Sequence, residues 1–352
     1  MNFEVTTLAL ALPVFVLSLF ALVKGADYLI KGAERIGRYF GLPSFVIGAL
    51  IVGIGTSLPE LASSFAAILR GSPEIVVSNA VGSNIANILL VAGLAAVIGR
   101  QIVTTKNLID IEVPLLLASS ALFLGTAMDG TITQLESSLL FAGFIAYITY
   151  LLIHPDESVI DKEHEEKEVN KLHFSDFAML VGGGGILVLG ANYLIQSVQV
   201  IAISLGVSEG VVAISAVAVG TSLPEIIVSV TAVFKGKTDL AFGNVFGSNV
   251  FNILMMVGVV GLFSELPIDV QTTQIGLPVF AAVTVMFVVS AMSKRIYIWE
   301  GLMFLIVYLF FFLILLLLYI LITLLFLFFF LFFLFFFARL FYYNFLHIFI
   351  LF

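Results

Sequence analysis

Cysteine is absent from this chain and charged residues are scarce. Without cysteine, neither disulfide bonds nor thiolate metal sites are available. Only 11% of the 352 residues are charged, against roughly 25% in a soluble globular domain, and 61% are hydrophobic. The histidines show no metal-ligand spacing and are scattered at His154, His164, His173 and His347. The composition predicts an all-α polytopic membrane protein that contacts the lipid bilayer and no nucleic acid.

Ten apolar segments are each near the roughly 20 residues that cross a bilayer. They are residues 8–30, 43–69, 75–99, 109–127, 135–153, 174–199, 207–234, 239–263, 276–292 and 298–318. We therefore expect a five-helix repeat at 1–154, an acidic loop at 155–172 and a second five-helix repeat at 173–318. Residues 319–352 are apolar and of low complexity, which predicts either one extra C-terminal helix or an extended tail.

Positive charges are distributed unequally between the loops. Thirteen lysines and arginines fall in loops on one side, and Arg70 alone falls on the other. The positive-inside rule then places the N-terminus outside the cell membrane and the loop 155–172 in the cytoplasm. That loop is predicted to be a solvated connector, with a regulatory cation site as the alternative. The first apolar run precedes its positive charges, which indicates a transmembrane helix and not a signal peptide.

One motif occurs twice, 165 residues apart. Gly55–Glu60 and Gly220–Glu225 both read GTSLPE, and Asn79–Ile88 (NAVGSNIANI) aligns without a gap with Asn244–Ile253 (NVFGSNVFNI). This indicates an internal duplication. Because each half has an odd number of spans, the two copies enter the membrane from opposite sides, as an inverted repeat.

Each copy carries one glutamate beside a proline. Pro59 and Pro224 should break their helices near 56–58 and 221–223, leaving Glu60 and Glu225 in the first turn of the next half-helix. Burying a carboxylate at mid-membrane costs at least roughly 2.5 kcal/mol, so two structural glutamates without an ion are disfavoured. Carbonyl oxygens freed at such breaks also need protein or ion partners.

Further oxygen-bearing side chains accompany the glutamates. Residues four apart share a helix face, so each Ser-x-x-x-Asn pair points one way. The candidates are Thr56, Ser57, Ser83 and Asn87 in the first copy and Thr221, Ser222, Ser248 and Asn252 in the second. Oxygen-only ligation favours hard cations such as Ca²⁺ and Na⁺. For the serines and asparagines, hydrogen bonding between helices without an ion is the alternative. The glycines Gly82, Gly247 and Gly182–Gly185 predict close helix packing.

The doubled GTSLPE followed by GSN-x-x-N resembles the α-repeats of the cation/calcium exchanger superfamily, in its sodium/calcium exchanger branch. The resemblance covers roughly residues 8–318, with the α-repeats at about 43–99 and 207–263. It implies a ten-helix antiporter, not an enzyme, that exchanges Na⁺ (commonly three) for Ca²⁺ by alternating access. Both ions are transported, no organic cofactor is implied, and a monomer should suffice. The first and sixth helices would be the sliding pair.

The resemblance also implies roles for individual residues. Glu60 and Glu225 would bind both ions, and Thr56 and Thr221 would offer backbone carbonyls to Ca²⁺. The remaining implied ligands are the side chains of Ser57, Ser83, Ser222, Ser248, Asn87 and Asn252 and the backbone oxygens of Gly53 and Ala218. Several relatives have Asp where Asn252 stands. The site would then carry two formal negative charges, which fits a K⁺-independent exchanger.

Three other functions are compatible with parts of this sequence pattern. A proton/calcium antiporter of the same superfamily ranks second, although its members differ in sequence around the glutamate. A cation channel is more remote, because a pore usually presents rings of ligands from several subunits. An intramembrane hydrolase would need a nucleophile–base pair or a metal triad, and the sequence offers neither.

Overall fold

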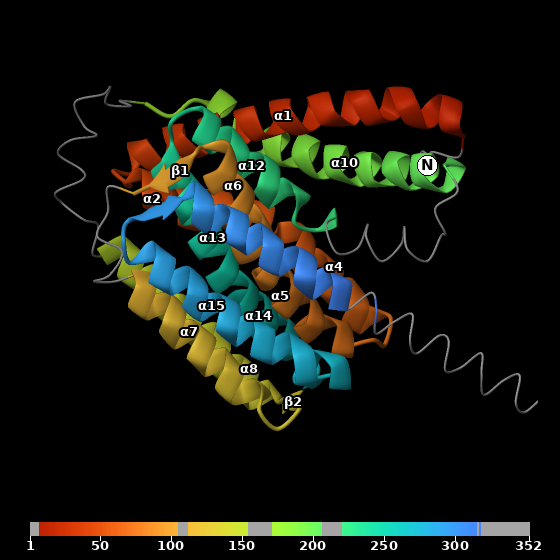
Figure 1. Cartoon of the computed structure of the whole chain (residues 1–352). Helices are drawn as coiled ribbons and strands as arrows, with labels where there is room; N and C mark the ends of the chain where they lie inside the picture. The colour runs from red at the N-terminus through yellow and green to blue at the C-terminus, as the bar shows by residue number, and fades with distance from the viewer. Residues whose placement is uncertain (1–6, 105–111, 154–170, 206–219, 315–316, 318–352) are drawn as a thin grey trace, which may run out of the picture. The chain divides into compact units, whose positions relative to one another are not determined.

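The computed structural model describes residues 7–104, 112–153, 171–205, 220–314 and 317, which are mostly helical (Figure 1). The chain divides into two compact units, Met1–Leu305 and Ile306–Phe352. In the second unit, residues 306–314 are helical. The predictions for residue 218, for most of the loop 155–172 and for the tail 319–352 lie outside the described residues.

The first half of the chain contains a long helix, a broken helix pair and two further helices. In order, these are α1 (Leu8–Tyr39), α2 (Ser44–Val46), the π-helical η1 (Ile47–Val52), α3 (Gly53–Thr56), α4 (Leu58–Leu69), α5 (Glu74–Ala86), the π-helical η2 (Asn87–Ala92), α6 (Gly93–Ile98), β1 (Gln101–Val103), α7 (Glu112–Ala127), β2 (Thr131–Ile132) and α8 (Gln134–Ile153).

The second half follows the same plan. In order, it contains α10 (Phe174–Ser204), α12 (Leu223–Phe234), α13 (Thr238–Val250), the π-helical η3 (Phe251–Met256), α14 (Val257–Gly261), β3 (Leu266–Pro267), the π-helical η4 (Thr272–Gly276), α15 (Leu277–Ala291), β4 (Arg295–Tyr297) and a last helix, Ile298–Ile314. Among the described residues, seven helices are long and apolar enough to cross a membrane and three apolar helices are shorter. The chain is therefore a multi-pass membrane protein, while the count of ten spans stays a prediction.

The helix α1 continues nine residues beyond the predicted apolar segment 8–30. Ala33, Ile36 and Gly37 stay buried on one face, so packing continues where the other face becomes charged. The helix ends in a Schellman motif. Gly41 adopts a φ of +71°, and the Leu42 N–H donates to the Gly37 carbonyl at 2.9 Å.

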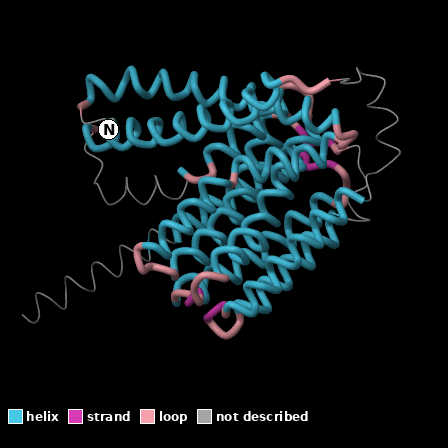
Figure 2. Tube along the Cα trace, turned by 180° about the vertical axis from the view of Figure 1, so that it is seen from behind, coloured by secondary structure: helices cyan, strands magenta, loops and turns pink. Residues whose placement is uncertain are grey.

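The duplication is visible in local structure. The helices α4 and α12 have 12 residues each and are followed by Gly71 and Gly236, with φ of +76° and +72°. Two short antiparallel ladders, β1–β4 and β2–β3, each join a strand of one half to a strand of the other. The 165-residue offset relates β1 to β3 and β2 to β4. The ladders lie at opposite ends of the bundle (Figures 1 and 2).

Glycines let two pairs of helices approach closely, as predicted. The helices α1 and α10 lie side by side, and a Cβ added at Gly183 would sit 2.5 Å from the Leu29 backbone nitrogen. A Cβ at Gly247 would sit 2.1 Å from the Ala49 carbonyl oxygen, where α13 crosses η1. The described residues place no atom within 4 Å of a Cβ at Gly82. Its repeat-equivalent neighbour would be residue 214, outside those residues, so that prediction stays untested.

Candidate cation site

Both glutamates lie where the sequence places them, immediately after a helix break. Ser57 and Ser222 precede α4 and α12 with nearly identical backbone angles, φ −89° and ψ 3° against φ −88° and ψ 1°. A proline in each first turn removes a donor that would be unpaired there in any case, which favours starting a new helix. Glu60 and Glu225 fall in these first turns, and each is only 1% exposed.

Side chains of the first repeat contact the second repeat across the breaks. The Ser57 hydroxyl donates to Glu225 Oε1 at 3.1 Å. The Ser248 hydroxyl donates to the Gly53 carbonyl at 3.2 Å, so this predicted backbone ligand lies beside a predicted side-chain ligand. Thr56 Oγ1 is 3.3 Å from Asn244 Oδ1. The structure therefore brings residues of the two copies, 168 to 195 positions apart in the sequence, into contact in the interior.

Six of the predicted ligands carry a buried polar atom without a hydrogen-bond partner. These atoms are Glu60 Oε2, Glu225 Oε2, Ser83 Oγ, Ser222 Oγ, Asn87 Oδ1 and Asn252 Oδ1. An unpaired buried polar atom costs about 1–3 kcal/mol, and more when it is charged. Buried polar atoms in native proteins are usually hydrogen-bonded, so these six atoms are candidates for binding a cation. Thr221 is only half-buried, and the Ala218 carbonyl lies outside the described residues.

A serine–asparagine pair in each copy was not predicted from the sequence. Asn79 Nδ2 donates to Ser64 Oγ at 3.1 Å, and Asn244 Nδ2 donates to Ser229 Oγ at 2.9 Å. Each serine follows the motif glutamate of its own copy by four residues, so it lies on the same helix face as that glutamate. That spacing, together with the 165-residue offset, is the signal that could have found them. These bonds tie α4 to α5 and α12 to α13 directly behind the glutamates.

The ligand chemistry is that of hard cations. Among the described residues, no group of three or more histidine, cysteine, aspartate or glutamate side chains could hold a metal ion. A cation site here would therefore need hydroxyl, amide or backbone oxygens beside the two carboxylates. Neutral oxygens around few carboxylates suit Na⁺ and Ca²⁺ better than zinc or copper.

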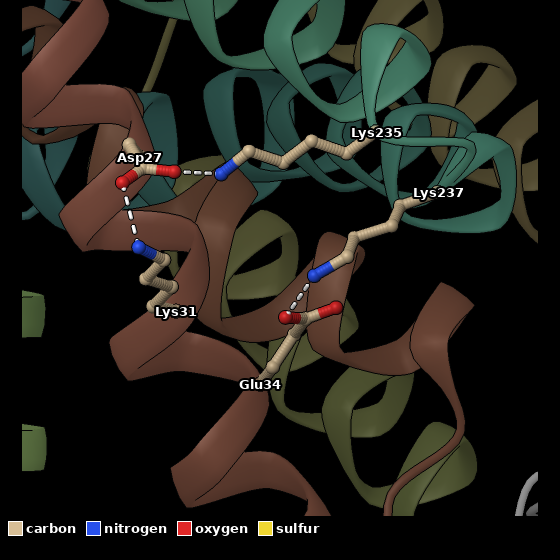
Figure 3. A network of polar contacts seen from close by, with 5 residues as sticks. All are labelled: Asp27, Lys31, Glu34, Lys235 and Lys237. Atoms are coloured by element: carbon tan, nitrogen blue, oxygen red, sulfur yellow. Dashed lines mark hydrogen bonds and ion pairs between the residues drawn. The ribbon is translucent and has the colours of Figure 1, made fainter. Parts of the chain in front are cut away.

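A second charged cluster connects α1 to the end of α12 (Figure 3). Asp27 pairs with Lys31 at 2.9 Å on its own helix and with Lys235 just after α12. Glu34, two turns further along α1, pairs with Lys237. Burial lowers the pKa of Lys235 from its usual value, and the positive charges of Lys237 and Lys24 lower it further. The first-repeat helix α1 is thus held by ion pairs to the helix that carries Glu225.

Residues 10–153 and 175–317 match the family model of the sodium/calcium exchanger proteins. The chain belongs to this family. Members of this family are membrane antiporters that transport ions. The stretch between the two matched regions, residues 154–174, coincides with the acidic loop.

Individual relatives cover most of the chain. It is 35% identical over 302 residues to the membrane protein MJ0091 of Methanocaldococcus jannaschii, covering 86% of this chain and 97% of the relative. It is 32% identical over 337 residues to the sodium/calcium exchanger MaX1 of Methanosarcina acetivorans, covering 84% and 95%. The solved structure of the sodium-calcium exchanger NCX_Mj, soaked with Na⁺ and Sr²⁺, matches with a TM-score of 0.72 and 31% identity over 86% of this chain and 98% of that one.

Proposed function

We propose that this exchanger moves Na⁺ against Ca²⁺ through one shared site centred on Glu60 and Glu225. The observation that carries the proposal is the set of buried, unpaired oxygens around these two carboxylates. A purely structural pair of glutamates would use its oxygens in hydrogen bonds within the protein. Here one oxygen of each glutamate has no hydrogen-bond partner, and the same is true of an oxygen in two serines and two asparagines of the duplicated motif.

The charge of the site gives a reason for exchange. Two carboxylates balance one Ca²⁺, or two of three Na⁺, so the two loaded states differ by one unit charge. Both ions need the same carboxylates, which makes their occupancy mutually exclusive. Asn252 contributes an oxygen without a third negative charge, and we therefore expect no requirement for K⁺. Both carboxylates come from one chain, so a monomer is sufficient.

Access to the site would alternate by movement of α1 and α10 against the other helices. The glycines Gly25, Gly32, Gly183 and Gly190 bring these two helices into close contact, so they can move as one body. The ion pairs of Asp27 with Lys235 and of Glu34 with Lys237 would have to break or exchange during this movement (Figure 3). They would therefore favour one of the two states. An inverted repeat would supply the second state by exchanging the conformations of the two halves.

Ion fluxes in proteoliposomes test the proposal. Purified protein is reconstituted into vesicles loaded with Na⁺, and ⁴⁵Ca²⁺ uptake is measured in Na⁺-free, K⁺-free medium. We expect uptake that requires the outward Na⁺ gradient and stops when the gradient is dissipated. Uptake driven by a pH gradient in vesicles without Na⁺ would instead indicate the proton/calcium antiporter. Downhill Ca²⁺ flux that needs no counter-ion would indicate a channel.

A further inference from the structure

Asn84 is a fully buried asparagine of α5 that connects the two repeats. Its Nδ2 donates to the backbone carbonyl of Asn249 at 3.0 Å. Its Oδ1 accepts a hydrogen bond from Asn252 Nδ2 at 3.1 Å. One side chain of the first repeat therefore contacts both the backbone of α13 and the side chain of an expected cation ligand in η3.

The direction of these bonds is determined by chemistry. A backbone carbonyl can only accept, so Asn84 must present its Nδ2 to Asn249 and its Oδ1 to residue 252. Asn252 must then donate its hydrogen bond from Nδ2, so the other polar atom of its amide, Oδ1, takes no part in this contact. That Oδ1 is buried and has no hydrogen-bond partner. Reversing the Asn252 amide would bring two acceptor oxygens together and leave a buried donor unpaired.

We propose that Asn84 is a positioning residue, which fixes the amide of Asn252 so that its oxygen is available to the transported cation. Asn84 itself does not contact the ion. The inference rests on the proposed function, because it concerns how one ligand of that site is oriented. Preorganisation of this kind raises affinity, since the ordering of the ligand is completed before the ion binds.

The duplicated sequence alone would not predict this role. Asn249 is the repeat equivalent of Asn84, and Asn87 is the equivalent of Asn252. Asn249 Nδ2 donates to the Val245 carbonyl of its own helix at 2.7 Å, and its Oδ1 has no hydrogen-bond partner. The bridge is therefore made in one direction, from the first repeat to the second.

A double-mutant cycle tests the proposal. The variants are Asn84→Leu, Asn252→Ala and the double substitution, and the readout is the Ca²⁺ concentration that gives half-maximal thermal stabilisation of the purified protein. Losing one hydrogen bond should raise this concentration about three- to tenfold for Asn84→Leu. In the Asn252→Ala background, Asn84→Leu should change this Ca²⁺ concentration by less than about twofold, because the amide through which Asn84 affects the ion has been removed.

Asn79→Leu is the matched control. It removes an amide from the same helix, and this amide donates to Ser63, Ser64 and the Glu60 backbone carbonyl but not to Asn252. Its effect should be equal in both backgrounds. In the flux assay, Asn84→Leu should raise the KM for Ca²⁺ and preserve the maximal rate, whereas damage to the fold would lower the rate. If Asn84→Leu does not accumulate in the membrane, Asn84→Ala, which adds no bulk, is judged by the same criteria.

The outcomes separate the two proposals. If the parent protein is not stabilised by Ca²⁺ at all, the proposed function fails. If the parent protein binds Ca²⁺ and Asn84→Leu has the same effect with and without Asn252, the positioning role is overturned. An unchanged half-saturating concentration for Asn84→Leu overturns it as well.

Discussion

Neutralising either site glutamate should weaken Ca²⁺ binding far more than Na⁺ binding. The substitutions are Glu60→Gln and Glu225→Gln, which remove charge and preserve shape. In Glu225→Gln the remaining carbonyl oxygen can still accept the hydrogen bond from Ser57, now 3.1 Å from Oε1. Both positions are 1% exposed, so water cannot replace the lost charge. The experiment therefore isolates electrostatics from packing.

The magnitude follows from the charge count. With two carboxylates the Ca²⁺-loaded site is neutral, and with one it retains a unit charge inside the membrane. Such a charge costs roughly 2.5–3.5 kcal/mol at the bilayer centre, which corresponds to roughly 60- to 300-fold weaker Ca²⁺ binding. Coulomb energy scales with the product of the charges, so the loss for each bound Na⁺ should be about half as large in free energy, or about tenfold in affinity per ion.

The assay is ion-dependent thermal stabilisation, followed by Na⁺-driven ⁴⁵Ca²⁺ uptake in vesicles. Glu74→Gln is the control, because Glu74 begins α5 in an exposed position and its loss changes the net charge equally. We expect this control to behave like the parent protein and both site variants to lose Ca²⁺ uptake while remaining folded. A Ca²⁺ affinity within threefold of the parent in either folded site variant would refute the reasoning. Equal losses for Ca²⁺ and Na⁺ would do so too.

Three further predictions concern movement, packing and topology. Partly exposed ion pairs contribute about 0.2–1 kcal/mol each, so replacing both Lys235 and Lys237 by Gln should shift the two-state equilibrium by about fivefold. The apparent Ca²⁺ affinities measured from the two sides of the membrane should move in opposite directions, whereas Lys31→Gln, which breaks a pair within α1 alone, should leave them unchanged. Gly183→Ala should lower the melting temperature, because its Cβ would lie 2.5 Å from the Leu29 backbone nitrogen. Gly182→Ala is the control and should leave the melting temperature unchanged, because no described atom lies within 4 Å of its Cβ. Equal melting temperatures for the two variants would contradict the packing argument. Single cysteines at Ser72 and Ser293 should react with an impermeant thiol reagent from opposite sides, and labelling from one side would exclude the inverted repeat.

The local features of the site could be read from the sequence. Each proline acts on its own turn, so the breaks at Ser57 and Ser222 and the places of Glu60 and Glu225 follow from neighbouring residues. The close approach at Gly247 and Gly183 likewise follows from the absence of a side chain. Apolar segment lengths predicted the multi-pass architecture, because the bilayer sets the length of each span.

Contacts between the repeats were decided only by the tertiary structure. The bonds from Ser57 to Glu225 and from Asn252 to Asn84 join residues 168 positions apart. Which side chains meet there depends on how the helices cross, and helical periodicity leaves the crossing undetermined. The 165-residue offset also makes Asn84 and Asn249 equivalent in sequence, although one bridges the repeats and the other bonds to its own helix. The sequence determined which oxygens gather in the membrane, and packing decided which of them remain free for a cation, because only packing assigns each donor to an acceptor.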